Sequence, residues 1–530
     1  MIKDFLKRIE EELNEEQRRA VCYDKGPSLV IAGAGSGKTR VLTYKIAYLL
    51  ERGWKPWNIL ALTFTNKAAR EMKERIARLV GHELAAGLWM GTFHSVFSRI
   101  LRKEADKIGF SSYFTIYDQA DSRNLIKTVI REMGLDDKTY KPASIAAHIS
   151  NAKNRLILPE AYLSDNAVRM ADQAAKIPMT GEIYLRYMSR LQQADVMDFD
   201  DLLLYTYILL KEHPEVCERY ADKFDFVLVD EYQDTNYAQH CIIWELTHKK
   251  QQVCVVGDDA QSIYSFRGAN IDNILNFTQK YNNAKLFKLE QNYRSTKTIV
   301  SAANSLISHN DRQIPKDVFS DKEKGSPLHV YSAYSDIEEA EIVVNQIAAL
   351  RRKEKMEYDD FAILYRTNAQ SRTFEEALRK RGMPYRIYGG LSFYQRKEIK
   401  DVIAYCRLTV NPHDEEAFKR VVNYPARGIG QTTVDKIVSA ASTDGVSLWE
   451  VVSRPEEHSL PVNKGTMGKL KAFTDIISGF IEKTELMDAA FLTQEIIRES
   501  GIMREIFQDV SPEGMSRQEN VQELLSGVQE

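Results

Sequence analysis

Residues 32–39, with the sequence AGAGSGKT, constrain the fold of this chain more than any other feature. They follow an apolar run at 28–31 and precede a predicted helix over 41–50. In such a loop the glycines let backbone N–H groups turn inward around phosphates, a lysine reaches the β- and γ-phosphates, and a hydroxyl ligates Mg²⁺ at the helix N-terminus. The order strand, loop, helix predicts a P-loop nucleotide site, although alanine stands where the strict pattern has its first glycine. A glycine-rich turn with an incidental lysine is the weaker alternative.

A phosphate-binding loop needs an acidic partner for the metal, and residues 226–231 (FVLVDE) supply one. Their apolar strand delivers Asp230 to the Mg²⁺ shell and places Glu231 to orient or deprotonate the attacking water. The apolar run at 253–256 leads to Gln261, an amide that can hydrogen-bond the γ-phosphate or the water. The candidate ATP-binding loop residues are Ala32, Gly33, Ala34, Gly35, Ser36, Gly37, Lys38, Thr39 and Arg40, with Thr39 and Asp230 as metal ligands and Lys38, Asp230, Glu231 and Gln261 as catalytic residues.

Short apolar runs predict the sheet that carries these residues. Each run ends in a polar or glycine-rich turn, which is typical of buried parallel strands with function at their carboxyl ends. The predicted strands of the first α/β core lie at 28–31, 59–64, 226–229 and 253–256. A second α/β unit is expected to start near Ala284, with strands at 285–289, 328–331 and 361–365.

Two stretches lack the strand signal. Between about 102 and 191 the apolar residues have helical spacing, which predicts a helical insertion in the first core. From about Glu398 to the end the pattern is helical again. At about 150 residues per domain, the 530 residues allow three or four domains, in agreement with two cores that each carry a helical part.

Charge and cysteine usage exclude several classes of protein. The 72 Lys+Arg against 75 Asp+Glu leave a net charge of −3, so nucleic-acid binding has to come from a local groove. Five scattered cysteines without a CxxC pattern indicate a reducing compartment and argue against zinc or iron–sulfur sites. The charged start lacks a signal-peptide core, and the longest apolar stretch, 202–210, is too short to span a bilayer. We therefore expect a cytoplasmic protein with no membrane contact.

Ten segments, in the same order along the chain, resemble the UvrD/Rep/PcrA helicases of superfamily 1. They are 13–21 (LNEEQRRAV), 32–39 (AGAGSGKT), 62–72 (LTFTNKAAREM), 91–95 (GTFHS), 229–236 (VDEYQDTN), 255–269 (VVGDDAQSIYSFRGA), 289–296 (LEQNYRST), 364–372 (LYRTNAQSR), 388–401 (YGGLSFYQRKEIKD) and 427–430 (RGIG). The resemblance implies an α/β fold with two RecA-like P-loop NTPase cores, the second incomplete, and mostly helical inserted subdomains. The implied domains are core 1A at 1–105 and 196–283, helical 1B at 106–195, partial core 2A at 284–395 and helical 2B at 396–530.

The resemblance also assigns roles around the nucleotide. It implies that Gln17 reads the adenine edge, because an amide can both donate and accept there. Tyr293 resembles the aromatic residue that stacks on the base, and Arg294 the arginine that contacts the γ-phosphate during phosphoryl transfer. An ordinary loop glutamine and a core tyrosine beside a surface arginine are the alternatives.

For DNA, the resemblance implies that single-stranded bases stack on Phe64, Tyr264 and Phe266, since every base offers a π-face. Phe266 replaces a tryptophan common at that position, which predicts a weaker grip. Burial in the core is the alternative for all three aromatic residues. Further DNA contacts are implied for Thr63, Asn66, Thr92, His94, Arg267, Arg366, Gly428 and Gly430. The two glycines precede a predicted helix and resemble a helix–hairpin–helix backbone site that touches duplex, with a plain linker as the alternative.

The implied function is ATP- and Mg²⁺-dependent 3′→5′ movement on single-stranded DNA, with opening of ss/ds junctions in repair or replication restart. Repair or replication proteins are the expected partners, and the expected state is a monomer or a weak dimer. An ATP-regulated DNA-binding module without autonomous unwinding and the motor arm of a helicase–nuclease are the alternatives, and stacking leaves RNA open as a substrate. Two later family motifs, a Thr-x-His-x-x-Lys-Gly-Leu-Glu type segment and a Thr-Arg-Ala type arginine, do not occur. We therefore expect a truncated chain whose hydrolysis and unwinding are severely impaired.

Overall fold

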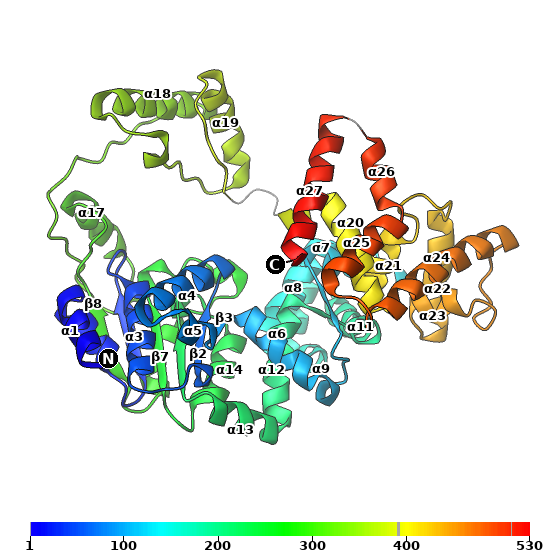
Figure 1. Cartoon of the computed structure of the whole chain (residues 1–530), viewed down its shortest axis with the longest axis horizontal. Helices are drawn as coiled ribbons and strands as arrows, with labels where there is room; N and C mark the ends of the chain where they lie inside the picture. Colours follow the sequence, from blue (N-terminus) through cyan, green and yellow to red (C-terminus); the bar gives the residue numbers. More distant parts are fainter. Residues whose placement is uncertain (1, 389–392, 510, 530) are drawn as a thin grey trace. The chain divides into compact units, whose positions relative to one another are not determined.

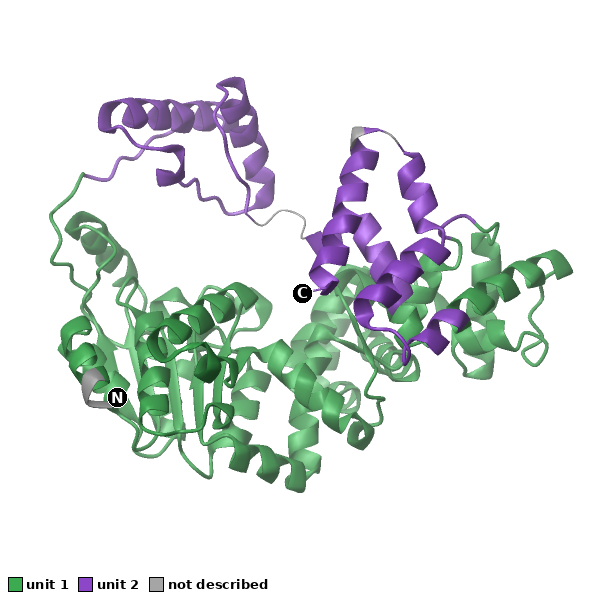
Figure 2. Ribbon diagram, in the orientation of Figure 1, with its two compact units in different colours: residues 1–326, 407–423, 427–478 green, residues 327–406, 424–426, 479–530 purple. Residues whose placement is uncertain are grey.

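A computed structural model of the chain describes residues 2–388, 393–509 and 511–529 (Figure 1). It divides into two units (Figure 2). Unit 1 comprises residues 1–326, 407–423 and 427–478, and unit 2 comprises residues 327–406, 424–426 and 479–530. Residues 389–392, which belong to the motif expected at 388–401, lie outside the described residues. Among the described helices, none is long and apolar enough to cross a membrane.

A six-stranded parallel sheet forms the centre of unit 1, which confirms the α/β class. The four strands expected for the first core all form. In spatial order the strands are β3 (Trp89–Thr92), β2 (Ile59–Thr63), β6 (Phe226–Val229), β7 (Val253–Gly257), β1 (Ser28–Ala32) and β8 (Lys285–Leu289). The strand expected to begin a second α/β unit is β8, and this placement is wrong. Ser28 of β1 pairs with Lys285, so β8 is an edge strand of the first sheet.

Alternate residues of the buried strands face two helical layers, as the two-residue period of a strand requires. In β1, Leu29 and Ile31 pack in one apolar cluster, whereas Val30 and Ala32 pack in the other. The first layer contains α6 (Phe93–Glu104), α12 (Phe199–Glu212), α13 (Pro214–Lys223) and α14 (Tyr237–Thr247). The second contains α1 (Ile2–Glu12), α2 (Glu15–Cys22), α3 (Lys38–Glu51), α4 (Asn66–Val80) and α5 (His82–Ala86). Short α15 (Asp272–Leu275), α16 (Phe277–Lys280) and α17 (Lys297–Ile307) complete this part of unit 1.

The insertion between β3 and β6 is mostly helical, as expected. It has its own apolar cluster around Tyr117, Ile130 and Tyr184. Its helices are α7 (Gln119–Glu132), α8 (Pro142–Asn154), α9 (Pro159–Ser164), α10 (Asn166–Ala174) and α11 (Thr180–Gln193). The sequence did not predict the parallel pair formed by β4 (Thr115–Tyr117) and β5 (Val196–Asp198), whose three residues each are too few to show a strand pattern.

A second group of helices in unit 1 packs on this insertion through buried polar contacts. Arg407, near the end of α20 (Lys397–Val410), forms an ion pair of 2.7 Å with Asp121. Thr115 donates its hydroxyl to Asp414 at 2.7 Å, and Arg190 pairs with Glu415 at 2.6 Å. The group continues through α21 (Glu415–Val421), α22 (Gln431–Asp444), α23 (Leu448–Ser453) and the start of α24 (Lys464–Lys483).

In unit 2, α18 (Asp336–Glu354) and α19 (Ser371–Lys380) share a small apolar cluster. The strands expected at 328–331 and 361–365 do not form, because a strand needs a hydrogen-bonding neighbour and no described residue pairs with either segment. Val330 and Leu364 are both 93% exposed. Unit 2 also contains residues 397–406 of α20, the end of α24, and the helices α25 (Ala489–Glu499), α26 (Ile502–Gln508) and α27 (Pro512–Gln529).

Candidate functional site

The loop between β1 and α3 has the geometry of a phosphate cradle. Gly35 (φ 69°) and Gly37 (φ 87°) both lie in the left-handed region, where a side chain would be strained. Gly37 caps α3 without any side-chain hydrogen bond, which leaves the first N–H groups of a 14-residue helix for an anion. Ser36 closes the turn by donating its hydroxyl to the Gly33 carbonyl at 2.7 Å. The loop predicted from the sequence therefore has the backbone geometry that an anion site needs.

Lys38 and the acidic pair after β6 meet at this loop. Lys38 Nζ lies 2.9 Å from Glu231 Oε2, and Glu231 itself has a left-handed backbone (φ 48°). Burial, followed by the charge of Glu231, raises the pKa of Asp230 to about 7. A buried carboxyl with a raised pKa next to a second carboxylate is stabilised by a cation. Mg²⁺ needs only one or two carboxylates when substrate phosphates supply the other oxygens, so the chemistry of Asp230 suits this ion. Thr39, in the first turn of α3, stays the predicted second ligand.

Gln17 lies directly beneath the cradle and is 2% exposed. Its Nε2 donates to the Ser36 carbonyl at 2.9 Å, and its Oε1 accepts from the Asn14 backbone N–H at 3.1 Å. Both ends of the amide are thus engaged with backbone groups, one in the loop and one at the start of α2. Arg40, also expected at the nucleotide, is exposed on α3 and lies 3.5 Å from Glu12.

The segment after β8 packs on the other side of the cradle. Gly33 donates its N–H to the Leu289 carbonyl at 3.0 Å, and the Tyr293 N–H donates to the Gly35 carbonyl at 3.0 Å. A Cβ on Gly35 would lie 2.8 Å from Arg294 Cβ, so this glycine is needed for the close approach. Tyr293 is 45% exposed and accepts from Asn14 at 2.7 Å, while Arg294 is exposed beside the loop. Tyr293 and Arg294 therefore lie beside the loop, and their contacts with a nucleotide stay a prediction.

A hydrogen-bonded chain extends from Glu231 to Gln261. Gln233 Nε2 donates to Glu231 Oε2 at 2.9 Å, and Gln233 Oε1 accepts from the Asp258 N–H at 3.0 Å. Gln261 Nε2 then donates to Asp258 Oδ2 at 2.7 Å. Lys316 Nζ lies 3.1 Å from Asp258 Oδ1 and offsets the negative charge of this aspartate. Sequence reasoning missed Gln233 and Lys316, together with Asn292, whose Nδ2 donates to the Ala34 carbonyl at 2.6 Å.

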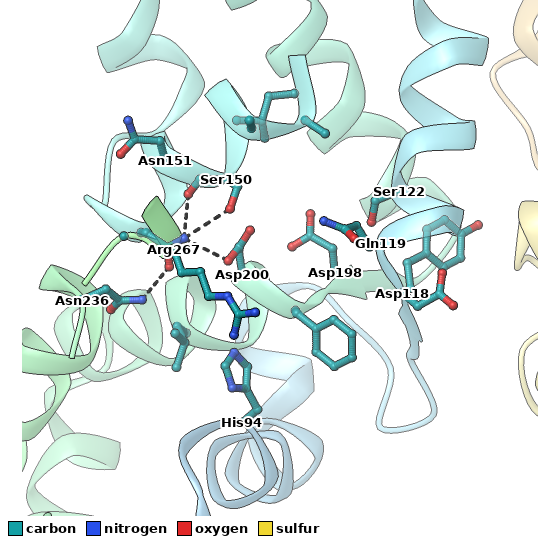
Figure 3. Close-up of a pocket in the computed structure, with 18 of the residues that line it drawn as sticks. His94, Asp118, Gln119, Ser122, Ser150, Asn151, Asp198, Asp200, Asn236 and Arg267 are labelled. Carbon is teal, nitrogen blue, oxygen red and sulfur yellow. Dashed lines mark hydrogen bonds between the residues drawn. The ribbon is translucent and has the colours of Figure 1, made fainter. Parts of the chain in front are cut away.

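Five of the residues predicted to contact DNA line one pocket of 840 Å³ between the sheet and the helical insertion (Figure 3). They are Phe64, His94, Tyr264, Phe266 and Arg267. Phe266 is 65% exposed and Tyr264 39% exposed, so these two are not core aromatics, whereas Phe64 packs partly on the core. Burial lowers the pKa of His94, whose ring meets Phe199 edge-on at 6.0 Å. The pocket thus combines aromatic faces with a cation.

The other residues predicted to contact DNA do not line this pocket. Thr63 is buried at the end of β2, Thr92 caps α6 by accepting from the Ser95 N–H at 3.2 Å, and Asn66 is exposed at the start of α4. Arg366 belongs to unit 2. Gly428 (φ 69°) and Gly430 precede α22, and Lys469 donates to the Gly428 carbonyl at 3.1 Å.

Comparisons with known proteins cover almost the whole chain. The model of the UvrD/REP helicase N-terminal domain matches residues 13–282, and that of the UvrD-like helicase C-terminal domain matches residues 287–530. The ATP-dependent DNA helicase PcrA of Leuconostoc citreum is 42% identical over 519 residues, which are 98% of this chain and 68% of that protein. PcrA of Staphylococcus aureus is 42% identical over 97% of this chain and 69% of its own length, and PcrA of Bacillus subtilis is 44% identical over 97% and 68%. These matches do not bear out the expected truncation, and they lend no support to the expected loss of activity.

Proposed function

The chain belongs to the UvrD/REP helicase family, and on that premise we propose that it is an ATP-dependent DNA helicase that moves 3′→5′ on single-stranded DNA. This proposal rests on one observation: residues at the carboxyl ends of strands in the same sheet line both the phosphate cradle and the aromatic pocket. Lys38 and Glu231 pair at the phosphate cradle, and an aromatic pocket that includes Phe64 and Tyr264 opens beyond strands β2 and β7. Hydrolysis and strand binding are then two activities of one folded unit.

In the proposed reaction, the N–H groups of residues 33–39 hold the phosphates. Lys38 gives up its ion pair with Glu231 and binds a phosphate oxygen instead. Glu231, released from the lysine, orients the attacking water and accepts its proton. Arg294 stabilises the charge that develops on the transferred phosphoryl group, and Gln261 hydrogen-bonds it. Asp230 and Thr39 would hold Mg²⁺, which offsets the charge on the phosphate oxygens when it is bound. Tyr293 packs on the base. Gln17 holds the loop, and it reads the adenine edge only by exchanging one of its two amide hydrogen bonds for one to the base.

On the DNA side, bases stack on Phe64, Tyr264 and Phe266, and Arg267 neutralises a backbone phosphate. We assign further backbone contacts to Asn66, Thr92, His94 and Arg366, and a duplex contact to the N–H groups at Gly428 and Gly430. The sequence predicts that Thr63 belongs to this set, but it is 2% exposed and is left out. Stacking tolerates every sequence, which suits a motor that moves along a strand.

The proposed setting is the cytoplasm, where DNA, ATP and reduced thiols coexist. The proposed substrates are single strands and ss/ds junctions that arise in repair and replication restart, and repair or replication proteins are the proposed partners. A monomer or a weak dimer is sufficient, because both sites lie in one chain.

A strand-displacement assay tests the proposal. A fluorescent duplex with a 3′ or a 5′ single-stranded tail is incubated with the chain, ATP and Mg²⁺, and single-strand-stimulated ATP hydrolysis is measured in parallel. We expect the chain to hydrolyse ATP and to displace the strand only from the 3′-tailed duplex. Lys38→Ala should abolish both activities. Hydrolysis without displacement from either duplex would favour an ATP-regulated DNA-binding module instead, and displacement from the 5′ tail would refute the polarity.

A further inference from the structure

Three buried asparagines lie where the helical insertion, the segment after β6 and the segment after β7 meet. They are Asn154 at the end of α8, Asn236 at the start of α14 and Asn273 in α15, with exposed fractions of 7%, 7% and 5%. A buried amide costs free energy unless its donors and its acceptor are bonded, so three of them in one place fix the segments that they join. Asn154 and Asn236 also line the pocket that contains Phe64 and Tyr264.

Both ends of the Asn154 amide are bonded. Its Nδ2 donates to the Ser150 carbonyl at 2.9 Å and to Asp200 Oδ1 at 3.0 Å (Figure 3). Ser150 lies one turn earlier in α8 and Asp200 lies in the first turn of α12, so these two helices set the orientation of the amide. Its Oδ1 accepts from Asn236 Nδ2 at 2.6 Å. This last bond ties α8 of the insertion to the segment after β6.

The loop at 264–268, which carries two aromatic residues and the cation of the pocket, packs on the same side chain. Gly268 ends this loop in the left-handed region (φ 86°), and a Cβ built there would lie 3.5 Å from Asn154 Cβ. The chain then enters α15, where Asn273 Nδ2 donates to the Asn236 carbonyl at 3.1 Å. The strand-binding loop is therefore held against both Asn154 and Asn236.

Asn236 stands close to the hydrolysis residues in the chain. It follows Glu231 by five positions, and the turn between them carries Gln233, whose Nε2 donates to Glu231 Oε2 at 2.9 Å. Asn236 Oδ1 accepts from the Gln239 N–H at 2.8 Å and so caps α14. The two ends of the Asn236 amide thus have separate tasks, since one starts the helix and the other contacts Asn154.

We propose that Asn154 is a positioning residue for strand-stimulated ATP hydrolysis: through Asn236 it holds the segment after Glu231 in the arrangement that a strand in the pocket stimulates. The inference rests on the proposed function, since it needs a chain whose hydrolysis responds to single-stranded DNA. Loss of the Asn154–Asn236 bond then lowers the hydrolysis rate at saturating DNA, whereas the affinity for the strand, which depends on stacking and on Arg267, is retained.

Two variants break this bond from opposite sides. Asn236→Ser keeps the start of α14, because serine caps a helix about as well as asparagine, but it has no Nδ2 to donate to Asn154. Asn154→Ala removes the acceptor, together with the bonds to Ser150 and Asp200. Asn124→Ala is the matched control, since this asparagine is exposed on α7 of the same insertion.

The test measures ATP hydrolysis of the full chain without DNA and with saturating dT20, and binding of labelled dT20 by fluorescence anisotropy. We expect the ratio of the two rates to fall about tenfold in Asn236→Ser and in Asn154→Ala, the effect of one hydrogen bond lost from the stimulated state. The dT20 affinity should stay within about threefold of wild type and the rate without DNA within about twofold. Asn124→Ala should keep the wild-type ratio.

Each outcome decides a different point. A stimulated wild type with an unchanged ratio in both variants overturns the inference and leaves the helicase proposal intact. Equal losses of both rates, which indicate a structural role, also overturn it, as does weaker dT20 binding with a normal rate at saturation. A wild-type chain that neither binds dT20 nor responds to it contradicts the proposed function as well. Circular dichroism establishes that each variant is folded, and if Asn154→Ala unfolds, the Asn236→Ser ratio decides.

Discussion

Lys38 Nζ lies 2.9 Å from Glu231 Oε2, so the lysine of the phosphate cradle is paired with the carboxylate that follows β6. The two residues lie 193 positions apart in the sequence, and the parallel pairing of the sheet brings them together. Because Glu231 is about a third exposed in this pair, the contact adds little to stability and is easily exchanged for a phosphate.

Removing either partner of this pair should affect hydrolysis and leave the fold intact. We expect Lys38→Ala to abolish single-strand-stimulated ATP hydrolysis, because the lysine is the contact to the β- and γ-phosphates. Glu231→Gln should lower the rate by about 10²- to 10⁴-fold while the chain still binds ATP, because the amide cannot accept the proton of water. A coupled-enzyme ATPase assay and a nucleotide-binding titration check the two results. A Glu231→Gln rate within threefold of wild type would remove this carboxylate from the mechanism.

Gln17 should act on nucleotide affinity through the shape of the cradle. Gln17→Ala removes the bond to the Ser36 carbonyl and the one from the Asn14 N–H, so we expect about tenfold weaker binding of ATP. If support of the loop dominates, GTP binding falls by the same factor. A loss confined to ATP would instead show that Gln17 reads the adenine edge. Titrations with both labelled nucleotides separate these outcomes.

Two substitutions of Phe266 should change the affinity for single-stranded DNA in opposite directions. Phe266→Ala should weaken single-strand binding by about 1–3 kcal/mol, which is the value of one base–aromatic stack. Phe266→Trp should strengthen binding, because the indole offers a larger stacking face. Anisotropy titrations with a labelled oligonucleotide measure both changes. Trp57→Ala is a suitable control, since this ring is also exposed, at 53%, but does not line the pocket.

Arg407 should be the strongest single determinant of the contact between the insertion and the second group of helices in unit 1. It lies 2.7 Å from Asp121 and 2.9 Å from Asp414, and its side chain is only 17% exposed. Arg407→Ala leaves buried carboxylates unpaired, so we expect a loss of about 3–5 kcal/mol in the free energy of unfolding. Arg19→Ala breaks an exposed pair of 2.7 Å with Glu16 and should cost less than about 1 kcal/mol. Urea unfolding followed by circular dichroism compares the two, and equal losses would contradict this assignment.

Glu416 should make stability depend on pH. Burial raises the pKa of Glu416 to about 7, against the opposing charge of Lys419, whereas the unfolded chain has a value near 4.5. The folded state therefore binds the proton more tightly, and this contribution to stability is complete below pH 4.5 and is lost as the pH rises through 7. Glu416→Gln should match wild type at pH 4.5 and be more stable at pH 8, by up to about 3 kcal/mol. Glu74→Gln, exposed on α4, should show no such difference.

The first sheet could be predicted largely from the sequence, because its buried strands are apolar on both faces and stand out as continuous runs. The sequence could not predict that β8 belongs to this sheet, since the pairing of Ser28 with Lys285 depends on tertiary structure and not on local pattern. The strands β4 and β5 have only three residues each, too few for a period to show, and β3 has only two apolar residues, Trp89 and Met90, before Gly91. The segments 328–331 and 361–365 have strand composition, but composition supplies no hydrogen-bonding neighbour.

For the site, residues with a distinctive chemistry were predictable and supporting residues were not. Lys38, Asp230 and Glu231 stand in recognisable motifs at the ends of strands. Gln233 and Asn292 lie inside the motifs VDEYQDTN and LEQNYRST, but only their contacts with Asp258 and Ala34 reveal their part in the network. The carboxylates Asp200 and Asp234 enter the pocket from segments 34 residues apart, and no linear pattern connects them.

Gln233 and Asp234 are joined by a single peptide bond, yet they belong to different sites. The Gln233 amide bonds with Glu231 and Asp258 beside the phosphate cradle, and Asp234 lines the pocket. The cradle and the pocket therefore draw on neighbouring residues of one short turn, Tyr232–Asp234. A shift of this turn when the nucleotide changes would carry Gln233 and Asp234 together, so the turn offers a short route between ATP hydrolysis and the strand-binding pocket.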